Sequence, residues 1–178
     1  MSEQEILLGS GNLSLGVVAN VATATETEIA AALTEVGAIS GGATLTYTPT
    51  FKEIKSANYG TLASFLTDEQ VTFTSGILNW NLKNLENFSA GAYSEDETAG
   101  TRRIGIGGLK NIPINYLRFE HTKPNGKKLT VNVFKAQSQN GFALNFDNEN
   151  ETIIDAQFLA LAVPGKTDGT LVEIIEEI

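Results

Sequence analysis

The sequence predicts an antiparallel β domain with one or two short helices. Thr, Val, Ile and Phe alternate with polar residues at a period of two over much of the chain, which is typical of half-buried strands. Lys123-Pro124-Asn125-Gly126 lies between two such runs and is a strong hairpin signal. The 178 residues contain no repeat, low-complexity tract or Pro-rich linker, so we expect a single domain spanning residues 1–178.

Three strands are expected in the first half of the chain. Residues 13–17 alternate after a Gly-Ser-Gly turn and predict a short first strand. Residues 43–48 predict a half-buried second strand that runs up to a proline, and residues 51–54 extend or bend it. The run 71–82 shifts phase near its middle, which predicts a third strand with a bulge or bend.

Two segments have helical periodicity. Thr25 and Glu28 have the spacing of a capping box, and apolar residues then recur at helical intervals up to Val36, which predicts a short helix between Thr25 and Val36. Residues 82–88 fit two turns of an amphipathic helix that covers one edge or end of the sheet.

The second half of the chain is predicted to consist of hairpins. Residues 114–122 and 127–136 flank the Pro-Asn-Gly turn. Further strands are expected at 142–146, 152–163 and 170–178. Residues 89–103 are rich in small and charged residues, which predicts a loop excursion or a hairpin tip.

A long loop is predicted from about Lys52 to Asp68. It holds Gly, Ala, Ser and Asn, with Leu62, Phe65 and Leu66 as its large apolar residues. Loops of about 12 to 15 residues or more are uncommon in compact domains and are usually functional or disordered. A purely solvated loop has no need of three large apolar side chains, so we expect this one to contact protein.

Composition excludes several classes of protein. There is no Cys, so thiol catalysis and Cys-ligated metal sites are excluded, and a single histidine, His121, excludes a two-His metal site. His121 lies beside the Pro-Asn-Gly turn and Glu120 lies on the opposite face of the same strand, so a Ser-His-acid arrangement is not implied. We expect His121 to be an exposed structural residue. No apolar run reaches the ~20 residues of a membrane span, and residues 1–5 lack the features of a secretory signal, which favours synthesis in the cytosol.

The remaining candidates for chemistry are weak. Residues 105–110 resemble a phosphate-binding loop, but Asn111 follows the lysine where Ser or Thr is needed. Asp147, Glu149 and Glu151 alternate as calcium ligands do, but they lack the glycine turn and downstream glutamate of an EF-hand, which favours a solvated turn. The residues therefore indicate a binding or structural protein without metal, cofactor or enzymatic activity.

Charge is distributed unevenly. Residues 1–50 carry a net charge of −5, residues 51–100 carry −4, residues 101–150 carry +5 and residues 151–178 carry −5, so that the chain totals −9. The basic segment is expected to pair with the acidic ones inside the subunit or, alternatively, with those of a neighbouring copy. The acidic total argues against nucleic-acid binding by phosphate neutralisation.

Four stretches carry a resemblance that spans nearly the whole chain. They are ILLGSGNLSLGVV at 6–18, LTEVGAISGGATLTYTPTFKEIKS at 33–56, LTDEQVTFTSGILNWNLKNLENF at 66–88 and QFLALAVPGKTDGTLVEIIEE at 157–177. In this order they resemble the tube-forming major tail proteins of tailed bacteriophages, especially those of prophages in Gram-positive bacteria. The resemblance rests on order and spacing rather than on one strong motif.

The resemblance implies a β-sandwich or partly rolled barrel of two antiparallel sheets with a flanking helix. It implies hexameric rings that stack into a tail tube, through which genome DNA passes without sequence-specific binding. The implied partners are further copies, a tape-measure protein, a tail terminator and, in a contractile tail, a sheath protein. The implied location is the virion tail, or the host bacterial cytoplasm during assembly, and not a membrane.

Other readings remain open from sequence. They are the tube of a contractile injection device, a terminator or decoration protein, and a carbohydrate-binding β-sandwich. In the resembling family the long connection between two sheet strands contacts the next ring, which makes Leu62, Phe65 and Leu66 candidate ring-stacking residues. The alternative is that these three side chains pack against the core of their own subunit.

Overall fold

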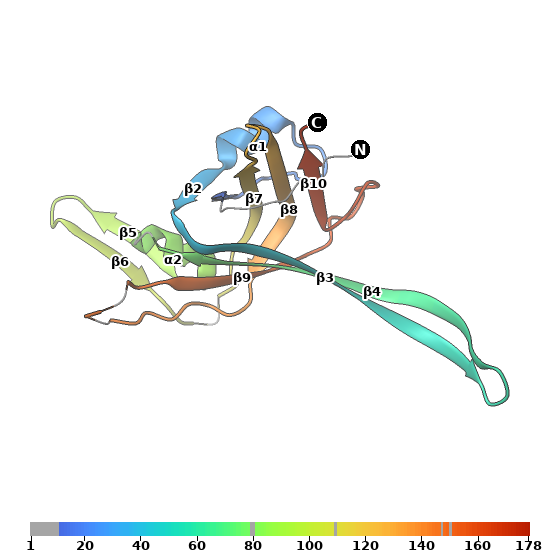
Figure 1. Ribbon diagram of the computed structural model, residues 1–178. Coiled ribbons are helices and arrows are strands. Elements are labelled where there is room, and N and C mark those ends of the chain that lie inside the picture. The colour runs from blue at the N-terminus through green and yellow to red at the C-terminus, as the bar shows by residue number, and fades with distance from the viewer. Residues whose placement is uncertain (1–10, 79–80, 109, 147, 150) are drawn as a thin grey trace.

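The structure is mostly antiparallel β-sheet, as predicted. It is a computed structural model that describes residues 11–178 except 79–80, 109, 147 and 150 (Figure 1). The elements are, in chain order, β1 (Asn12–Gly16), α1 (Glu26–Ala32), β2 (Thr34–Gly37), β3 (Ile39–Ser56), β4 (Gly60–Ile77), the 3-10 turn η1 (Leu82–Asn84), α2 (Leu85–Phe88), β5 (Ala92–Asp96), β6 (Thr101–Gly105), β7 (Ile114–Thr122), β8 (Lys128–Ser138), β9 (Ile154–Ala160) and β10 (Val172–Glu176).

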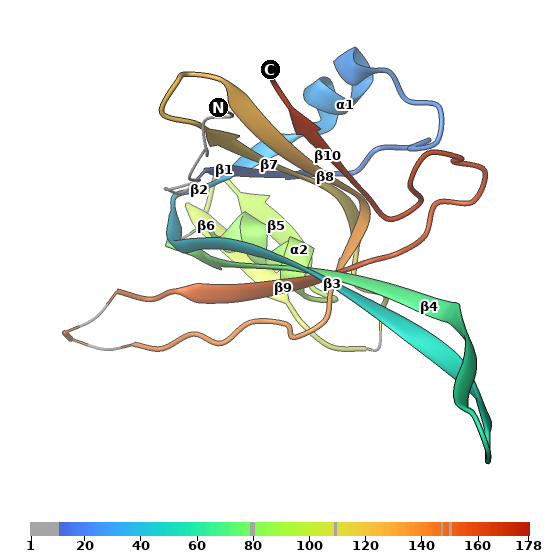
Figure 2. The same ribbon diagram turned by 45° about the vertical axis from the view of Figure 1, so that its right-hand side comes forward.

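One bent strand, β8, joins two layers of sheet. The hydrogen-bonded order is β2-β1-β7-β8-β9-β4-β3, and β10 also pairs with β8. The first half of β8 pairs with β10 from Leu129 to Val133, and its last residues, from Ala136, pair with β9. One layer is therefore β2-β1-β7-β8-β10 and the other is β8-β9-β4-β3, folded over each other (Figure 2). This is the sandwich-like architecture that the resemblance implies.

The main core lies between these two layers. The Phe73 ring of β4 and the Phe119 ring of β7 meet across it with centroids 5.8 Å apart. At one end, α2 places Phe88 against Phe158 of β9, with ring centroids 5.6 Å apart. Offset aromatic pairs at this spacing stabilise a core by about 0.5–1.5 kcal/mol beyond burial alone. The predicted short helix at 82–88 is confirmed as η1 followed by α2.

Helix α1 covers the outer face of the β7–β8 layer. Its capping box is formed as predicted, because the Thr25 hydroxyl accepts a hydrogen bond from the Glu28 backbone amide and the Glu28 carboxylate accepts one from the Thr25 amide. Ile29 packs in a small second core with Tyr116 and Phe134. The helix ends at Ala32, so its predicted extension to Val36 is wrong.

Tertiary burial explains where this helix ends. Leu33 is already in an extended conformation, and Val36 belongs to β2, where it is buried in the main core between the layers. A further helical turn would keep Val36 on the outer face of the sheet. The helical spacing of Val36 was therefore coincidental, because burial in the larger core outweighs local periodicity.

The predicted hairpins are largely confirmed. β7 and β8 pair around the Pro-Asn-Gly turn, where Lys123 and Gly126 form a backbone hydrogen bond and Gly126 has a φ of 84°. The segment 89–103 holds most of the β5–β6 hairpin, which projects from the body (Figure 1). β9 and β10 lie within the predicted strands 152–163 and 170–178.

Two predicted strand segments are wrong. β4 ends at Ile77 rather than continuing to Leu82, and Trp80 of the predicted run lies outside the described residues. Among the described residues of 142–146 there is no strand. Just before this segment, the Asn140 side chain bonds the backbone of β9, donating to the Asp155 carbonyl and accepting from the Gln157 amide.

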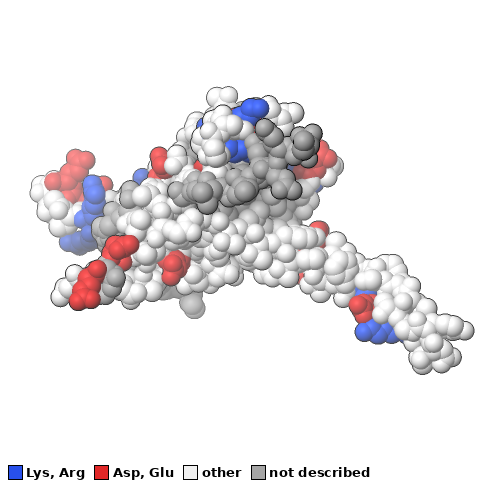
Figure 3. All heavy atoms as spheres, in the orientation of Figure 1, with Lys and Arg blue, Asp and Glu red and all other residues white. Residues whose placement is uncertain are grey.

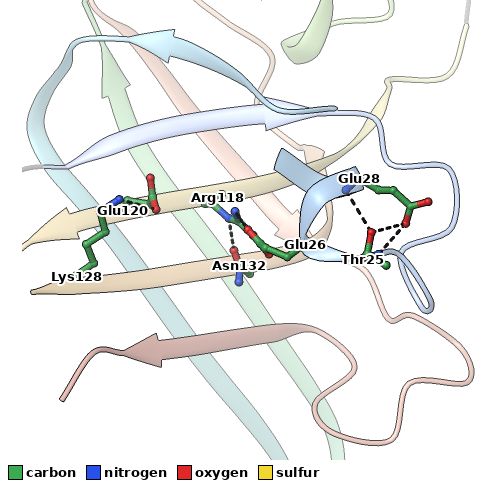
Figure 4. A network of polar contacts seen from close by, with 7 residues as sticks. All are labelled: Thr25, Glu26, Glu28, Arg118, Glu120, Lys128 and Asn132. Atoms are coloured by element: carbon green, nitrogen blue, oxygen red, sulfur yellow. Dashed lines mark hydrogen bonds and ion pairs between the residues drawn. The ribbon is translucent and has the colours of Figure 1, made fainter. Parts of the chain in front are cut away.

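The uneven charges pair within the subunit. Arg118 of the basic segment contacts Glu26, Arg102 contacts Glu95 and Lys123 contacts Glu176, so the basic segment reaches each of the three acidic ones. Figure 4 shows Arg118 between Glu26 of α1 and the Asn132 side chain of β8. Glu120 lies on the same outer face and pairs with Lys128. Of the two pairings left open by sequence, the one inside the subunit is found.

None of the helices in the described part of the chain is long and apolar enough to cross a membrane.

Candidate assembly surface

The most prominent feature is a two-stranded arm that extends from the sandwich. β3 and β4 are 18 residues each and pair from Ile39 and Ile77 at the root to Ser56 and Gly60 at the tip. Their outer parts, residues 46–70, leave the body and project well beyond it (Figures 1 and 2). We call residues 46–70 the arm. The predicted long loop from Lys52 to Asp68 is therefore wrong, because these residues form a β-hairpin.

Two bulges on β4 explain why sequence periodicity failed here. Thr50 pairs with Asp68 and Phe51 pairs with Leu66, so Thr67 is an extra residue, and Leu62 is a second extra residue closer to the tip. Each bulge moves the apolar positions of β4 by one residue relative to strict alternation. The spacing of Leu62, Phe65 and Leu66 therefore resembles a loop although the backbone is extended.

The root of the arm contains a third irregularity. Gly41 and Gly42, with φ of 70° and 82°, are extra residues between the pairs Ser40–Gly76 and Ala43–Ser75. The Ser75 hydroxyl donates to the Gly42 carbonyl over 3.3 Å. Both φ values lie in the region that glycine adopts without steric cost. The Gly-Gly pair thus redirects β3 as it leaves the core.

The arm has no hydrophobic core of its own. Buried residues alternate along β4 from Val71 to Ile77, but residues 60–70 contain none. Seven of the large apolar side chains that are about half exposed or more belong to this hairpin: Tyr47, Phe51, Ile54, Tyr59, Leu62, Phe65 and Leu66. The candidate ring-stacking residues Leu62, Phe65 and Leu66 are thus exposed, and their packing against the core of their own subunit is excluded. Their role in ring stacking remains a prediction.

The exposed apolar side chains are divided between the two faces of the arm. Residues directly opposite each other in an antiparallel pair share a face, and successive residues alternate. Phe51 and Leu66 are a pair and lie on the face that continues from the core pair Leu45–Phe73. Ile54, opposite Ala63, and Phe65, opposite Lys52, lie on the other face. Both faces of the arm therefore carry exposed apolar side chains, and polar residues such as Thr48, Lys52 and Gln70 lie beside those of the second face.

Two pairs of polar side chains contact each other along the arm. The Tyr47 hydroxyl donates to Glu69 Oε1 over 2.8 Å, and this bond raises the pKa of Tyr47. Lys55 Nζ lies 2.8 Å from Glu53 Oε2. In Figure 3 the arm is mostly white, with a small group of charges in its outer part. The arm is thus a nearly neutral surface on a strongly acidic chain.

The chain exposes more surface than a compact monomer of its size. Its accessible surface is 11,707 Å² at a mass of 19.0 kDa. Compact monomers of this mass expose about 8,400 Å² by the usual scaling, so the excess is roughly 3,300 Å². The projecting arm contributes to this excess (Figure 1).

The other sequence candidates do not form a site. His121 is 6% exposed rather than exposed as predicted, because it shares the inner face of β7 with Leu117 and Phe119. It lines a mostly apolar hollow of about 290 Å³ at the open end of the sandwich. Asp147 lies outside the described residues, and the described residues contain no group of three or more His, Asp or Glu that could hold a metal.

No protein-family model and no curated protein sequence matches the chain. The functional argument therefore rests on the arm, the sandwich and the distribution of charge.

Proposed function

We propose that this protein is a self-assembling structural subunit, the major subunit of a phage tail tube built from stacked hexameric rings. The observation that carries the proposal is the arm, a hairpin with exposed apolar side chains and no core of its own. An isolated two-stranded hairpin is at best marginally stable in water. Large exposed apolar patches generally mark interaction sites. The arm is therefore expected to be covered by protein in the assembled state.

The sandwich supports an assembly of identical copies. In the described part of the chain β2 and β3 end the sheet order and β10 pairs only with β8, so several strand edges are candidates for pairing with a neighbour. A monomer must protect such edges, whereas a closed ring removes them. A net charge of −9 also suits a conduit for DNA, because an acidic wall repels phosphates and prevents adhesion.

The test is assembly of the purified protein. On concentration it should form rings or tubes that are visible by negative-stain electron microscopy, while a dilute sample runs as a small species in size-exclusion chromatography. The double variant Phe65→Ser with Leu66→Ser should keep its thermal midpoint to within a few degrees and lose tube growth. Val17→Ser removes a similarly exposed apolar side chain from the body, and serves as the control.

A protein that stays monomeric at millimolar concentration at every salt concentration would refute the proposed function. A double variant that unfolds easily but still polymerises on cooling would refute the role of the arm. Its two side chains are 56% and 48% exposed, so little burial is lost by the substitutions.

A further inference from the structure

We infer that Asn140 is a site of spontaneous deamidation, and that this reaction irreversibly releases the segment 141–146 from β9. The inference concerns the chemistry of a single subunit and is independent of the proposed function. An asparagine followed by glycine is prone to deamidation, because glycine has no side chain that hinders attack by its own backbone nitrogen. The chain contains two such pairs, Asn125-Gly126 and Asn140-Gly141, and both asparagines are exposed.

The reaction needs only water as a co-reactant. The backbone nitrogen of Gly141 attacks Cγ of Asn140, and the proton of that nitrogen leaves with the side-chain amide as ammonia. Water then opens the resulting cyclic imide at one of its two carbonyls, which gives aspartate or isoaspartate. The reaction therefore depends on whether the glycine nitrogen is available and whether the asparagine side chain can reach it.

The two glycine nitrogens differ in availability. The Gly126 amide donates to the Lys123 carbonyl over 2.9 Å, and the Lys123 amide donates to the Lys127 carbonyl over 2.8 Å, so both bonds hold the tight turn between β7 and β8. Among the described residues, no acceptor is bonded to the Gly141 amide. Attack at Asn125 requires the turn to break, whereas the nitrogen at Gly141 is already available.

The side chain of Asn140 is held away from this nitrogen by two bonds to β9. Nδ2 donates to the Asp155 carbonyl over 3.0 Å, and Oδ1 accepts from the Gln157 amide over 3.1 Å. Both bonds are exposed to water, and no strand follows among the described residues 141–146. Exposed bonds at the edge of an irregular segment open at low free-energy cost. Each opening brings the carboxamide within reach of the Gly141 nitrogen.

The product cannot restore both bonds. A carboxylate accepts hydrogen bonds but does not donate, so aspartate loses the bond to the Asp155 carbonyl and places a negative charge beside that oxygen. Isoaspartate also lengthens the backbone at this point. Phe142 and Leu144 of the following segment pack against the main core, and their attachment is weakened when the bonds to β9 are lost. Deamidation is therefore a one-way release.

The reaction can be followed at both asparagines in one sample. Trypsin cleaves after Arg118, Lys127, Lys135 and Lys166 but not between Lys123 and Pro124, so Asn125 lies in peptide 119–127 and Asn140 in peptide 136–166. The dilute full-length protein is incubated at mildly alkaline pH, and fragmentation mass spectrometry measures the acid form at each position over time. Conversion at Asn140 should be at least about tenfold faster than at Asn125.

The matched control is the same chain in concentrated urea. Both asparagines precede glycine, so their rates should agree to within about threefold once the fold is removed. Equal conversion of the two in the folded protein, or faster conversion at Asn125, would refute the assignment. No conversion at Asn140 during the time in which the unfolded chain converts would show that its two bonds protect it, and would also refute the assignment.

The release is tested separately with Asn140→Asp. This variant should lower the thermal midpoint by about 2–5 °C, and chymotrypsin should cut within residues 141–146 several-fold faster than in wild type. Asn125→Asp is the control, because a carboxylate there can still accept the bond that the Lys127 amide donates to Asn125 Oδ1. An Asn140→Asp variant with the midpoint and cleavage rate of wild type would refute the release.

Discussion

Arg118 of β7 and Glu26 of α1 form a two-pronged ion pair across 92 residues of sequence, with Nη2 of the arginine 2.9 Å from Oε2 of the glutamate. The guanidinium is largely buried, whereas the Glu26 side chain is 71% exposed. Arg118 also donates from Nε to the Asn132 side chain over 2.9 Å (Figure 4). The pair therefore fixes α1 on the outer face of the β7–β8 layer.

Removing the charge of Glu26 should reduce stability in a pH-dependent way. The hydrogen bond from Arg118 lowers the pKa of Glu26. A lowered folded-state pKa gives stability that is present above the unfolded-state pKa and lost as pH falls through the folded-state value. Glu26→Gln should therefore cost up to about 1 kcal/mol at pH 7, limited by solvent screening of an exposed partner. Chemical denaturation should show this difference shrinking towards zero below about pH 3.

The matching control for that measurement is Glu28→Gln. Glu28 also has a lowered pKa, because it accepts hydrogen bonds from Thr25, but it makes its contact within the capping box rather than with Arg118. Glutamine can retain a capping-box bond. A Glu26→Gln variant whose stability follows that of wild type at every pH would show that the ion pair contributes nothing.

Sequence periodicity predicted the elements whose partners are close in the chain. The β7–β8 hairpin follows from its Pro-Asn-Gly turn and the start of α1 follows from Thr25 and Glu28, because these are signals within a few residues. The segment 142–146 has the same alternation and is not a strand, since alternation does not supply a partner strand. Val36 was misassigned for a related reason, as its environment comes from the opposite layer.

The conformation of the candidate segment was not predicted, because the bulges at Thr67 and Leu62 concealed its strands. Leu62, Phe65 and Leu66 are exposed, and their role as a contact surface remains a prediction. The distribution of the apolar side chains over both faces also escaped prediction, because a bulge decides which residues share a face and leaves no local signature in the sequence. His121 was wrongly predicted to be exposed. It lies two residues after Phe119 in the same strand and therefore on the same face, and this spacing could have indicated its burial.

The contribution of the core can be separated from that of the arm with two phenylalanines on one strand. Phe73 of β4 is 2% exposed and packs against Phe119 between the layers. Phe73→Ala should cost about 3–5 kcal/mol through lost burial and the cavity left behind. Phe65→Ala, on the exposed arm, should change the free energy of unfolding by less than about 0.5 kcal/mol. Urea titration of the dilute subunits measures both, and equal losses would contradict the assignment of the arm as coreless.

Chelation should leave stability unchanged. No metal-binding group is found among the described acidic residues, and Glu149 and Glu151 lie in a segment predicted to be a solvated turn. A bound ion would add stability by mass action, which EDTA would remove. The thermal midpoint should therefore be the same within error in EDTA and in millimolar calcium. A loss of several degrees in EDTA that calcium restores would indicate a site at residues 147–151.

Salt should promote polymerisation, because the repulsion between copies is electrostatic whereas the proposed attraction between them is hydrophobic. Copies that each carry −9 repel one another, whereas the arm contacts of the proposed assembly are apolar and nearly uncharged. The Debye length falls from about 10 Å at 0.1 M salt to about 3 Å at 1 M, so salt screens the repulsion and leaves apolar burial in place. The critical concentration for polymerisation, measured by sedimentation, should therefore fall as NaCl rises over this range. Asp168→Lys, at an exposed site on the body, replaces a negative charge by a positive one and so changes the net charge by +2. It should lower the critical concentration at low salt but not at 1 M. A critical concentration that rises with salt would instead mean that ion pairs between copies dominate, and that the apolar faces of the arm are not the principal contact.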